Sequence, residues 1–212
     1  MAVMTAAELR ADWLKGLSGT GEDTALERLI TRVSARISRH LGYPPASASG
    51  TPTIESTAYT RYYGTENVSD DGQVLTLDVL PVTTLTSIYD DLQRAFGSDT
   101  LVDSGAYTLL DGSAGKVWIV LSGSHGVWQQ GEKNIKVAFT AGWATSPGNL
   151  IPPDLLEAHG LLAKVWFEQR GRIGLSSVPQ GSGSASVRDP DSDIPIEIRH
   201  LLAPYKLPRE LL

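Results

Sequence analysis

The chain has 212 residues and a formal net charge of −6, and its 41% hydrophobic and 20% charged residues are typical of a folded globular protein. It has no cysteine, which excludes a disulfide framework, a thiol nucleophile and a cysteine-ligated metal. The acidic balance argues against general nucleic-acid binding, because that affinity comes largely from basic residues that displace counterions from phosphates. No stretch approaches the roughly 18 apolar residues of a membrane span. We also expect no signal peptide, because no basic region followed by an apolar block precedes residue 14.

Two helices are predicted before Gly42. Thr5 and Glu8 have the spacing of a capping box, and apolar residues then recur on one face, which predicts a helix over residues 5–17. Residues 22–41 form a clearer amphipathic helix, whose apolar residues follow the i, i+3, i+4, i+7 pattern. The arginines of this second helix lie mostly off the apolar face: Arg28, Arg32, Arg36 and Arg39.

Residues from about 54 to 142 have a period of two and predict an antiparallel β-region of five to seven strands. Ile135, Val137 and Phe139, for example, alternate with more polar residues. The Asp71-Gly72 and Asp111-Gly112 pairs are typical of hairpin turns. The run KVWIVL, residues 116–121, is apolar on both faces, so we expect this strand to be covered on both.

A third helix is predicted over residues 153–170, with Pro153 and Asp154 in its first turn. It is apolar almost all round and must therefore be covered on more than one side. The second cover is either the chain's own core or a neighbouring subunit. If it is a subunit, the candidate interface residues are Leu156, His159, Trp166 and Phe167.

After a core of residues 1–172, a Ser/Gly/Pro/Asp-rich segment without periodicity predicts a flexible linker over 173–193. A tail over 194–212 follows, in which Asp193 caps a short helix and Pro204 ends it. The tail either docks on another protein, by inserting the apolar face of its helix into a groove on that protein, or folds back on its own core. Its candidate partner-binding residues are Ile194, Ile198, Leu201, Leu202, Tyr205 and Leu207. The whole pattern predicts an α+β fold, a small helical bundle with an inserted antiparallel sheet region and a C-terminal tail carrying a short helix.

Motifs for phosphate and metal binding are weak. GLSGTG, residues 16–21, has the glycine spacing of a phosphate loop, but Glu22 and Asp23 follow where Lys and Ser/Thr are needed. Asp189, Asp191 and Asp193 start like a calcium loop, yet Ile194 and His200 occupy its glycine and glutamate positions. None of the histidines at 40, 125, 159 and 200 has zinc-ligand spacing. We therefore assign no metal and no cofactor.

Catalytic motifs are equally weak. No GxSxG elbow is present, and a dispersed Ser-His-Asp triad is recognised only by geometry. The aromatic group Tyr59, Tyr62 and Tyr63 beside Arg61 either stacks on bases or packs within a sheet, and the acidic chain favours sheet packing. We assign no catalytic residue and predict that the protein is not an enzyme.

The order of these elements resembles the head–tail connector (adaptor or head-completion) proteins of tailed bacteriophages and prophages. The resemblance spans residues 22 to 207 in four stretches: ALERLITRVSARISRHLGY, TAYTRYYGTENVSDDGQVLTLDVLPVTTLTSIYDD, IKVAFTAGWATSPGNLIPPDLLEAHGLLAKVWFEQRG and IPIEIRHLLAPYKL. Its specificity lies in the series, from the arginine-bearing helix through YYG and TAGW to the final LLAPY. Residues 5–17, 46–53 and 174–187 fall outside it.

This resemblance implies a virion protein, assembled in the host cytoplasm, that forms a twelvefold ring between the capsid portal and the tail. The expected partners are the portal protein, a stopper or tail-completion protein, and further copies of the chain. DNA would pass through the channel without specific binding, and no membrane would be involved. The alternatives are a stopper or tail-completion ring, an oligomeric module that binds a surface, and a hydrolase with a dispersed triad.

Overall fold

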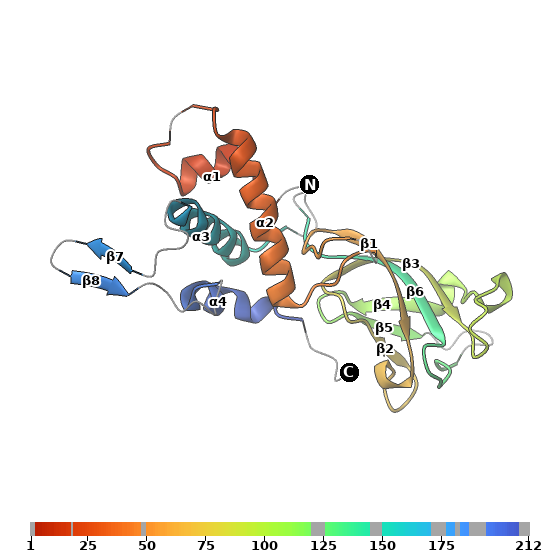
Figure 1. Cartoon of the computed structure of the whole chain (residues 1–212). Helices are drawn as coiled ribbons and strands as arrows, with labels where there is room; N and C mark the ends of the chain where they lie inside the picture. The colour runs from red at the N-terminus through yellow and green to blue at the C-terminus, as the bar shows by residue number, and fades with distance from the viewer. Residues whose placement is uncertain are drawn as a thin grey trace. The chain divides into compact units, whose positions relative to one another are not determined.

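The computed structural model describes residues 3–17, 19–47, 50–119, 126–144, 150–170, 177–180, 183–186 and 194–207. The chain divides into two compact units (Figure 1). Residues 1–37 and 151–206 form a helical unit, and residues 38–150 and 207–212 form a β-unit. The α+β fold class is confirmed, including the short helix near the C-terminus. Within the described ranges, no helix is long and apolar enough to cross a membrane.

The helical unit begins with α1, Ala6–Asp12, which has the predicted capping box. The Glu8 N–H donates to Thr5 Oγ1 at 3.2 Å, and the Thr5 N–H donates to Glu8 Oε2 at 2.7 Å. These bonds satisfy donors that the first helical turn leaves without partners. The helix ends five residues earlier than expected, and Gly16 has a φ of 106° in the turns that follow. The glycine-rich connection therefore starts before Gly16.

The second helix, α2, runs over Asp23–Leu41 as predicted. Its apolar stripe is buried: Leu26, Ile30, Val33, Ile37 and Leu41. The third helix, α3, spans Pro153–Gln169 and packs against both α1 and α4, the last being Ile196–Leu202. The buried residues of α3 are Leu155, Ala158, His159, Gly160, Leu162 and Ala163. Burial along much of α3 thus comes from the chain's own helices.

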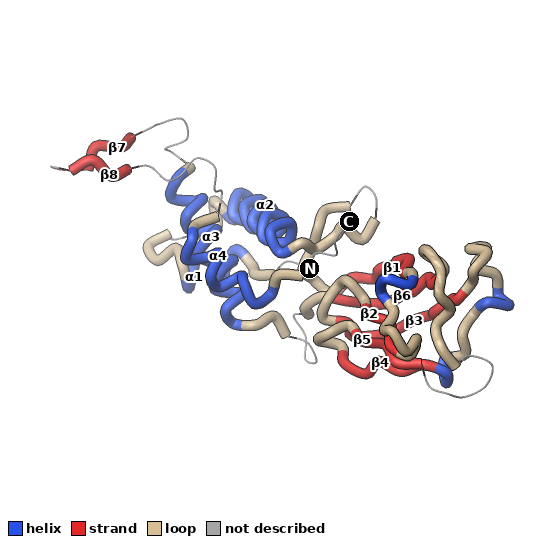
Figure 2. The backbone as a smooth tube through the Cα atoms, turned by 90° about the horizontal axis from the view of Figure 1, so that it is seen from below, coloured by secondary structure: helices blue, strands red, loops and turns tan. Residues whose placement is uncertain are grey.

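The β-unit contains two three-stranded antiparallel sheets (Figure 2). The first has the order β1-β6-β3, from Thr57–Tyr63, Ile135–Ala141 and Val82–Asp90. Phe139 on the central strand lies opposite Tyr59 on one side and Leu85 on the other. Alternate residues of β6 are buried, which confirms the predicted period of two.

The second sheet has the order β2-β5-β4, from Val74–Thr76, Lys116–Ile119 and Tyr107–Asp111. Asp111-Gly112 starts the β4–β5 hairpin connection, as predicted. Asp71-Gly72 also forms a tight turn, in which the Gly72 N–H donates to the Ser69 carbonyl at 2.8 Å.

The prediction that KVWIVL is covered on both faces is wrong over its described residues. Val117 and Ile119 are buried, whereas Lys116 and Trp118 face outward. Because the outward-facing Trp118 is itself apolar, the sequence of this strand lacks the alternation that would have shown that only one of its faces is buried. Residues 120 and 121 lie outside the described ranges.

The predicted linker contains regular secondary structure that its sequence pattern does not indicate. Strands β7, Ser177–Gln180, and β8, Gly183–Ser186, pair as an antiparallel hairpin with Ser177 opposite Ser186. The two strand sequences, SVPQ and GSAS, show no regular alternation of apolar and polar residues, so the pattern of a half-buried strand is missing from the sequence.

Candidate assembly surfaces

The C-terminal segment is anchored in its own chain. In the helical unit, α4 packs on α3, and Ile194, Ile198 and Leu202 are at most 3% exposed. In the β-unit, Leu207 is buried and its N–H donates to the Leu41 carbonyl at 2.9 Å. Four of the six residues predicted to bind a partner are therefore core residues in this structure.

This arrangement corresponds to the second reading of the tail, folding back on its own core. An apolar stripe shows only that a helix face must be buried, and not which chain buries it. Of the remaining candidates, Leu201 and Tyr205 are half-buried, and Ile196 on the same helix is 57% exposed. Those three residues keep part of their large apolar or aromatic side chains accessible to a partner, beside exposed polar residues such as Glu197 and His200. Asp193, the predicted cap, lies outside the described residues.

His159 lies in the interior of the helical unit, with 1% of its surface exposed. Its Nδ1 is 2.8 Å from the Leu155 carbonyl, one turn earlier on α3. Burial disfavours the charged imidazolium and lowers the pKa of His159 to about 4, so the side chain is neutral at physiological pH. His159 is therefore a core residue in this structure, and we no longer count it among the candidate interface residues.

The other three interface candidates on α3 remain partly accessible, since Leu156, Trp166 and Phe167 are all half-buried. The Arg32 guanidinium of α2 lies 6.0 Å from the centre of the Trp166 ring. This part of the helical unit therefore presents an arginine and an aromatic ring together, a combination enriched at protein–protein contacts.

The ends of α2 and α3 are joined by an ion pair. Arg170 Nη1 donates to Glu22 Oε2 at 2.7 Å, and the same guanidinium stacks 3.9 Å from the Phe167 ring centre. The hydrogen bond from Arg170 lowers the pKa of the Glu22 carboxyl below its usual value. Glu22 and Asp23 are the two carboxylates that argued against a phosphate loop on sequence grounds. In the structure, Glu22 pairs with Arg170, and Asp23 Oδ1 lies 2.7 Å from Arg10 Nη1.

Gly160 permits a close approach between α1 and α3. A Cβ built at this position would lie 2.1 Å from Cε2 of Trp13, far inside van der Waals contact. Trp13 is the C-cap residue of α1, so its indole holds the end of that helix against the bare backbone of α3. This contact gives residues 5–17, which lie outside the family resemblance, a place in the core of the helical unit.

The described residues contain no group of three or more His, Asp or Glu side chains placed to hold a metal ion. Asp189, Asp191, Asp193 and His125 lie outside the described ranges.

The tyrosine group of β1 divides between the two faces of its sheet. Tyr59 and Tyr63 are buried, and the Tyr63 hydroxyl donates to Asp78 Oδ1 at 2.6 Å. Arg61 Nη2 donates to the other oxygen of the same carboxylate at 3.0 Å. Burial and the negative charge of Asp78 raise the pKa of Tyr63. These contacts support sheet packing for Tyr59 and Tyr63 and leave only Tyr62 on the outer face.

Tyr62 is 50% exposed and belongs to an aromatic cluster that was not predicted from the sequence. Its ring centre lies 5.4 Å from that of Phe96, and Lys136 Nζ lies 5.6 Å from Phe96 and 5.1 Å from Tyr89. Tyr62 and Tyr89 are both register partners of Lys136. Strand register creates this row, so no local pattern could have signalled it.

The loop that carries Phe96 is held by Asp91. The Asp91 carboxylate accepts hydrogen bonds from the N–H groups of Gln93, Ala95 and Phe96, each at 2.8 Å. These bonds, that of Phe96 foremost, lower the pKa of Asp91. Phe96 has a φ of 52°, a left-handed conformation that such bonds can hold.

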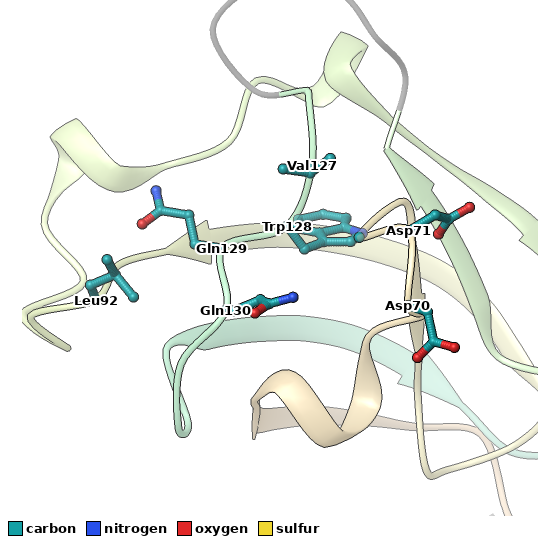
Figure 3. Close-up of a pocket in the computed structure, with 8 residues that line it drawn as sticks. Asp70, Asp71, Leu92, Val127, Trp128, Gln129 and Gln130 are labelled. Carbon is teal, nitrogen blue, oxygen red and sulfur yellow. The ribbon is translucent and has the colours of Figure 1, made fainter.

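An open depression of about 380 Å³ lies beside this loop (Figure 3). Its lining residues come from three separate segments: Asp70, Asp71, Gly72, Leu92, Val127, Trp128, Gln129 and Gln130. Leu92 and Val127 are 57% and 50% exposed, whereas Trp128 is buried at the base. The depression combines apolar side chains with two carboxylates, but it holds no constellation typical of a catalytic site.

No protein-family model and no curated protein matches the chain. Among solved structures, it is similar to a chain from the "neck of empty GTA particle computed with C6 symmetry", with a TM-score of 0.60 and 21% identity over 99% of this chain and 92% of that one. A chain from the virion of the native gene transfer agent (GTA) particle gives a TM-score of 0.57 at 21% identity, with the same coverage. A third, from the neck of the native particle computed with C12 symmetry, gives 0.55 at 20% identity over 97% and 90% of the two chains. At these identities, the similarity establishes a shared fold.

Proposed function

We propose that this chain is a structural protein of a virus-like particle neck, an adaptor that forms a ring between the capsid portal and the tail. The observation that carries the proposal is the extent of the structural match. One fold accounts for 99% of this chain and 92% of a chain from a particle neck, so both units and the C-terminal segment are included. The series of sequence motifs that resembles phage connectors supports the same proposal.

A ring of identical copies around a DNA channel suits the features of the chain. Necks with C6 and C12 symmetry contain chains of this fold, which supports a cyclic assembly of twelve copies. The net charge of −6 suits a wall along which DNA slides without being held. The adaptor would join the portal to a stopper or tail-completion protein, extend the DNA channel, and reside in the mature particle after assembly in the host cytoplasm.

Each candidate surface then has a proposed role. Leu156, Trp166 and Phe167, half-buried on α3, contact the neighbouring subunit. Ile196, Leu201 and Tyr205, large side chains of the C-terminal segment that stay at least partly accessible, contact the portal. Ile194, Ile198, Leu202 and Leu207 position that contact from within the chain's own core.

The decisive experiment is co-purification of the full chain with the portal protein from the same genome. A tagged portal should retain the wild-type chain as a stoichiometric ring, measured by native mass spectrometry. A Leu201→Ser, Tyr205→Ala variant should bind at least tenfold more weakly, since loss of an interface anchor typically costs more than 1 kcal/mol. A Leu101→Ser variant is the matched control, because Leu101 is 45% exposed in the β-unit and has no proposed portal contact.

The outcomes separate the competing functions. Binding to the portal supports the adaptor, whereas binding only to purified tail proteins would assign the chain to the stopper or tail-completion class. If the chain bound neither and were absent from purified particles, the proposed function would be refuted. If the Leu201→Ser, Tyr205→Ala variant bound the portal as well as the wild type, the adaptor role would stand, but the proposed contact between the C-terminal segment and the portal would be excluded.

A further inference from the structure

The outer side of α2 carries a stripe of arginines with no acidic neighbours on the same face. Arg28, Arg32 and Arg36 follow one another at intervals of four residues, so at 100° per residue they fall within about 80° around the helix axis and span about 12 Å. Arg28 and Arg32 are exposed. The buried side of the helix, with Leu26 and Ile30, lies on the opposite face.

This stripe is electrostatically unfavourable in the isolated chain. Like charges four residues apart on a helix repel each other, and opposite charges at that spacing stabilise. Among the described residues, no carboxylate lies within 4.0 Å of a guanidinium nitrogen of Arg28 or Arg32. The ion pairs of the helical unit instead use Arg10, Lys164 and Arg170. The two exposed arginines are therefore available for an acidic partner.

Acidic surface is concentrated in the other unit of the same chain. Residues 38–150 contain 11 Asp and Glu against six Lys and Arg, a net charge of −5. Asp70, Asp99 and Glu132 are exposed, and none of them makes an ion pair with a described Lys or Arg. In a cyclic ring of more than two copies, each copy presents two different surfaces that complement each other. A basic helix face and an acidic β-unit are such a pair.

We propose that the Arg28–Arg32 stripe, together with the adjacent Trp166, binds the acidic β-unit of a second copy of this chain. The inference rests on the proposed function, because it identifies the contact that would close the ring. Arginine suits this role, since its planar guanidinium pairs with carboxylates in two-point geometry and can also stack on aromatic rings. The Arg32 guanidinium lies 6.0 Å from the centre of the Trp166 ring. A nucleic-acid phosphate is the competing occupant, but the chain's net charge of −6 opposes it.

The test is a charge exchange between two full-length variants. One is Arg28→Glu, Arg32→Glu, and the other is Asp70→Lys, Asp99→Lys, Glu132→Lys, which changes the β-unit from −5 to +1. Each variant alone should fill the portal ring poorly, with occupancy falling about tenfold at low salt. Mixing the two should restore occupancy, because each ring contact then joins opposite charges. A Lys15→Glu variant, which adds negative charge at an exposed residue of the helical unit outside both proposed surfaces, is the control and should assemble like the wild type.

Arg28→Gln, Arg32→Gln keeps the proposal testable if charge reversal disturbs folding. Circular dichroism should show it melting at or slightly above the wild-type temperature, because repulsion between like charges along the helix is relieved, and the salt dependence of its ring occupancy should be weaker. Wild-type-like assembly by all variants, or failure of the mixture to recover, would overturn the interface while leaving the adaptor role intact. Loss of DNA retention with unchanged ring occupancy would assign the stripe to nucleic acid instead. If the wild-type chain never bound the portal, both the proposed function and this interface would fall.

Discussion

Replacing Leu202 by alanine tests whether the C-terminal helix belongs to the core of its own chain. Leu202 lies on α4 with no exposed surface, in the helix that packs on α3. A buried Leu→Ala change removes about three carbon atoms from an apolar environment and leaves a cavity, which together cost about 2–5 kcal/mol. The free chain should therefore lose that amount of unfolding free energy.

The assay is urea denaturation of the free chain, followed by helical circular dichroism. Ile196→Ala is the matched control, because Ile196 lies on the same helix and is 57% exposed. Its effect should stay within about 0.5 kcal/mol, as is usual for surface substitutions. A Leu202→Ala variant as stable as this control would refute the reasoning. It would mean that in solution α4 leaves α3 and that its apolar face is free for another chain.

Three further changes probe the two units. Gly160→Ala should destabilise the helical unit, although alanine is the better helix former, because the added Cβ would overlap Trp13. Thermal melting should show this loss of stability in the wild-type background and no such loss in a Trp13→Ala background. The pKa of His159 falls from 6.5 in the unfolded chain to about 4 in the folded chain, so its contribution to stability is fully present above pH 6.5 and declines towards pH 4, by up to about 3 kcal/mol. Urea denaturation at several pH values should show a smaller decline for His159→Gln than for the wild type. Equal declines would contradict this. Tyr63→Phe removes a hydrogen bond to the Asp78 carboxylate and should cost about 1.5–3 kcal/mol in urea denaturation, whereas Tyr62→Phe on the outer face should be neutral.

The helices and the β-region were predictable because their signals are local. The capping box at Thr5 and the apolar stripe of α2 depend on residues within one or two turns, and both are present as predicted. Alternation in β6 and the Asp111-Gly112 turn likewise depend only on near neighbours. In each case, the spacing of side chains along the backbone contained the information.

The candidate surfaces were less predictable, because they depend on which segments meet. The tail stripe Ile194, Ile198 and Leu202 was correctly identified as a face that needs burial, but the sequence left two occupants open. Only packing on α3 shows that the chain itself can supply the cover. The Tyr62–Phe96–Lys136 cluster joins strands from distant parts of the chain, and register alone creates it.

The sequence by itself determined the kinds of element, their order and the acidic charge of the chain, because periodicity, turn residues and composition are properties of short segments. The tertiary structure decided which apolar residues are core and which remain accessible. It buried His159, left Arg28 and Arg32 exposed, and brought Trp13 onto Gly160. Burial is a property of two surfaces in contact, and a single linear pattern specifies only one of them.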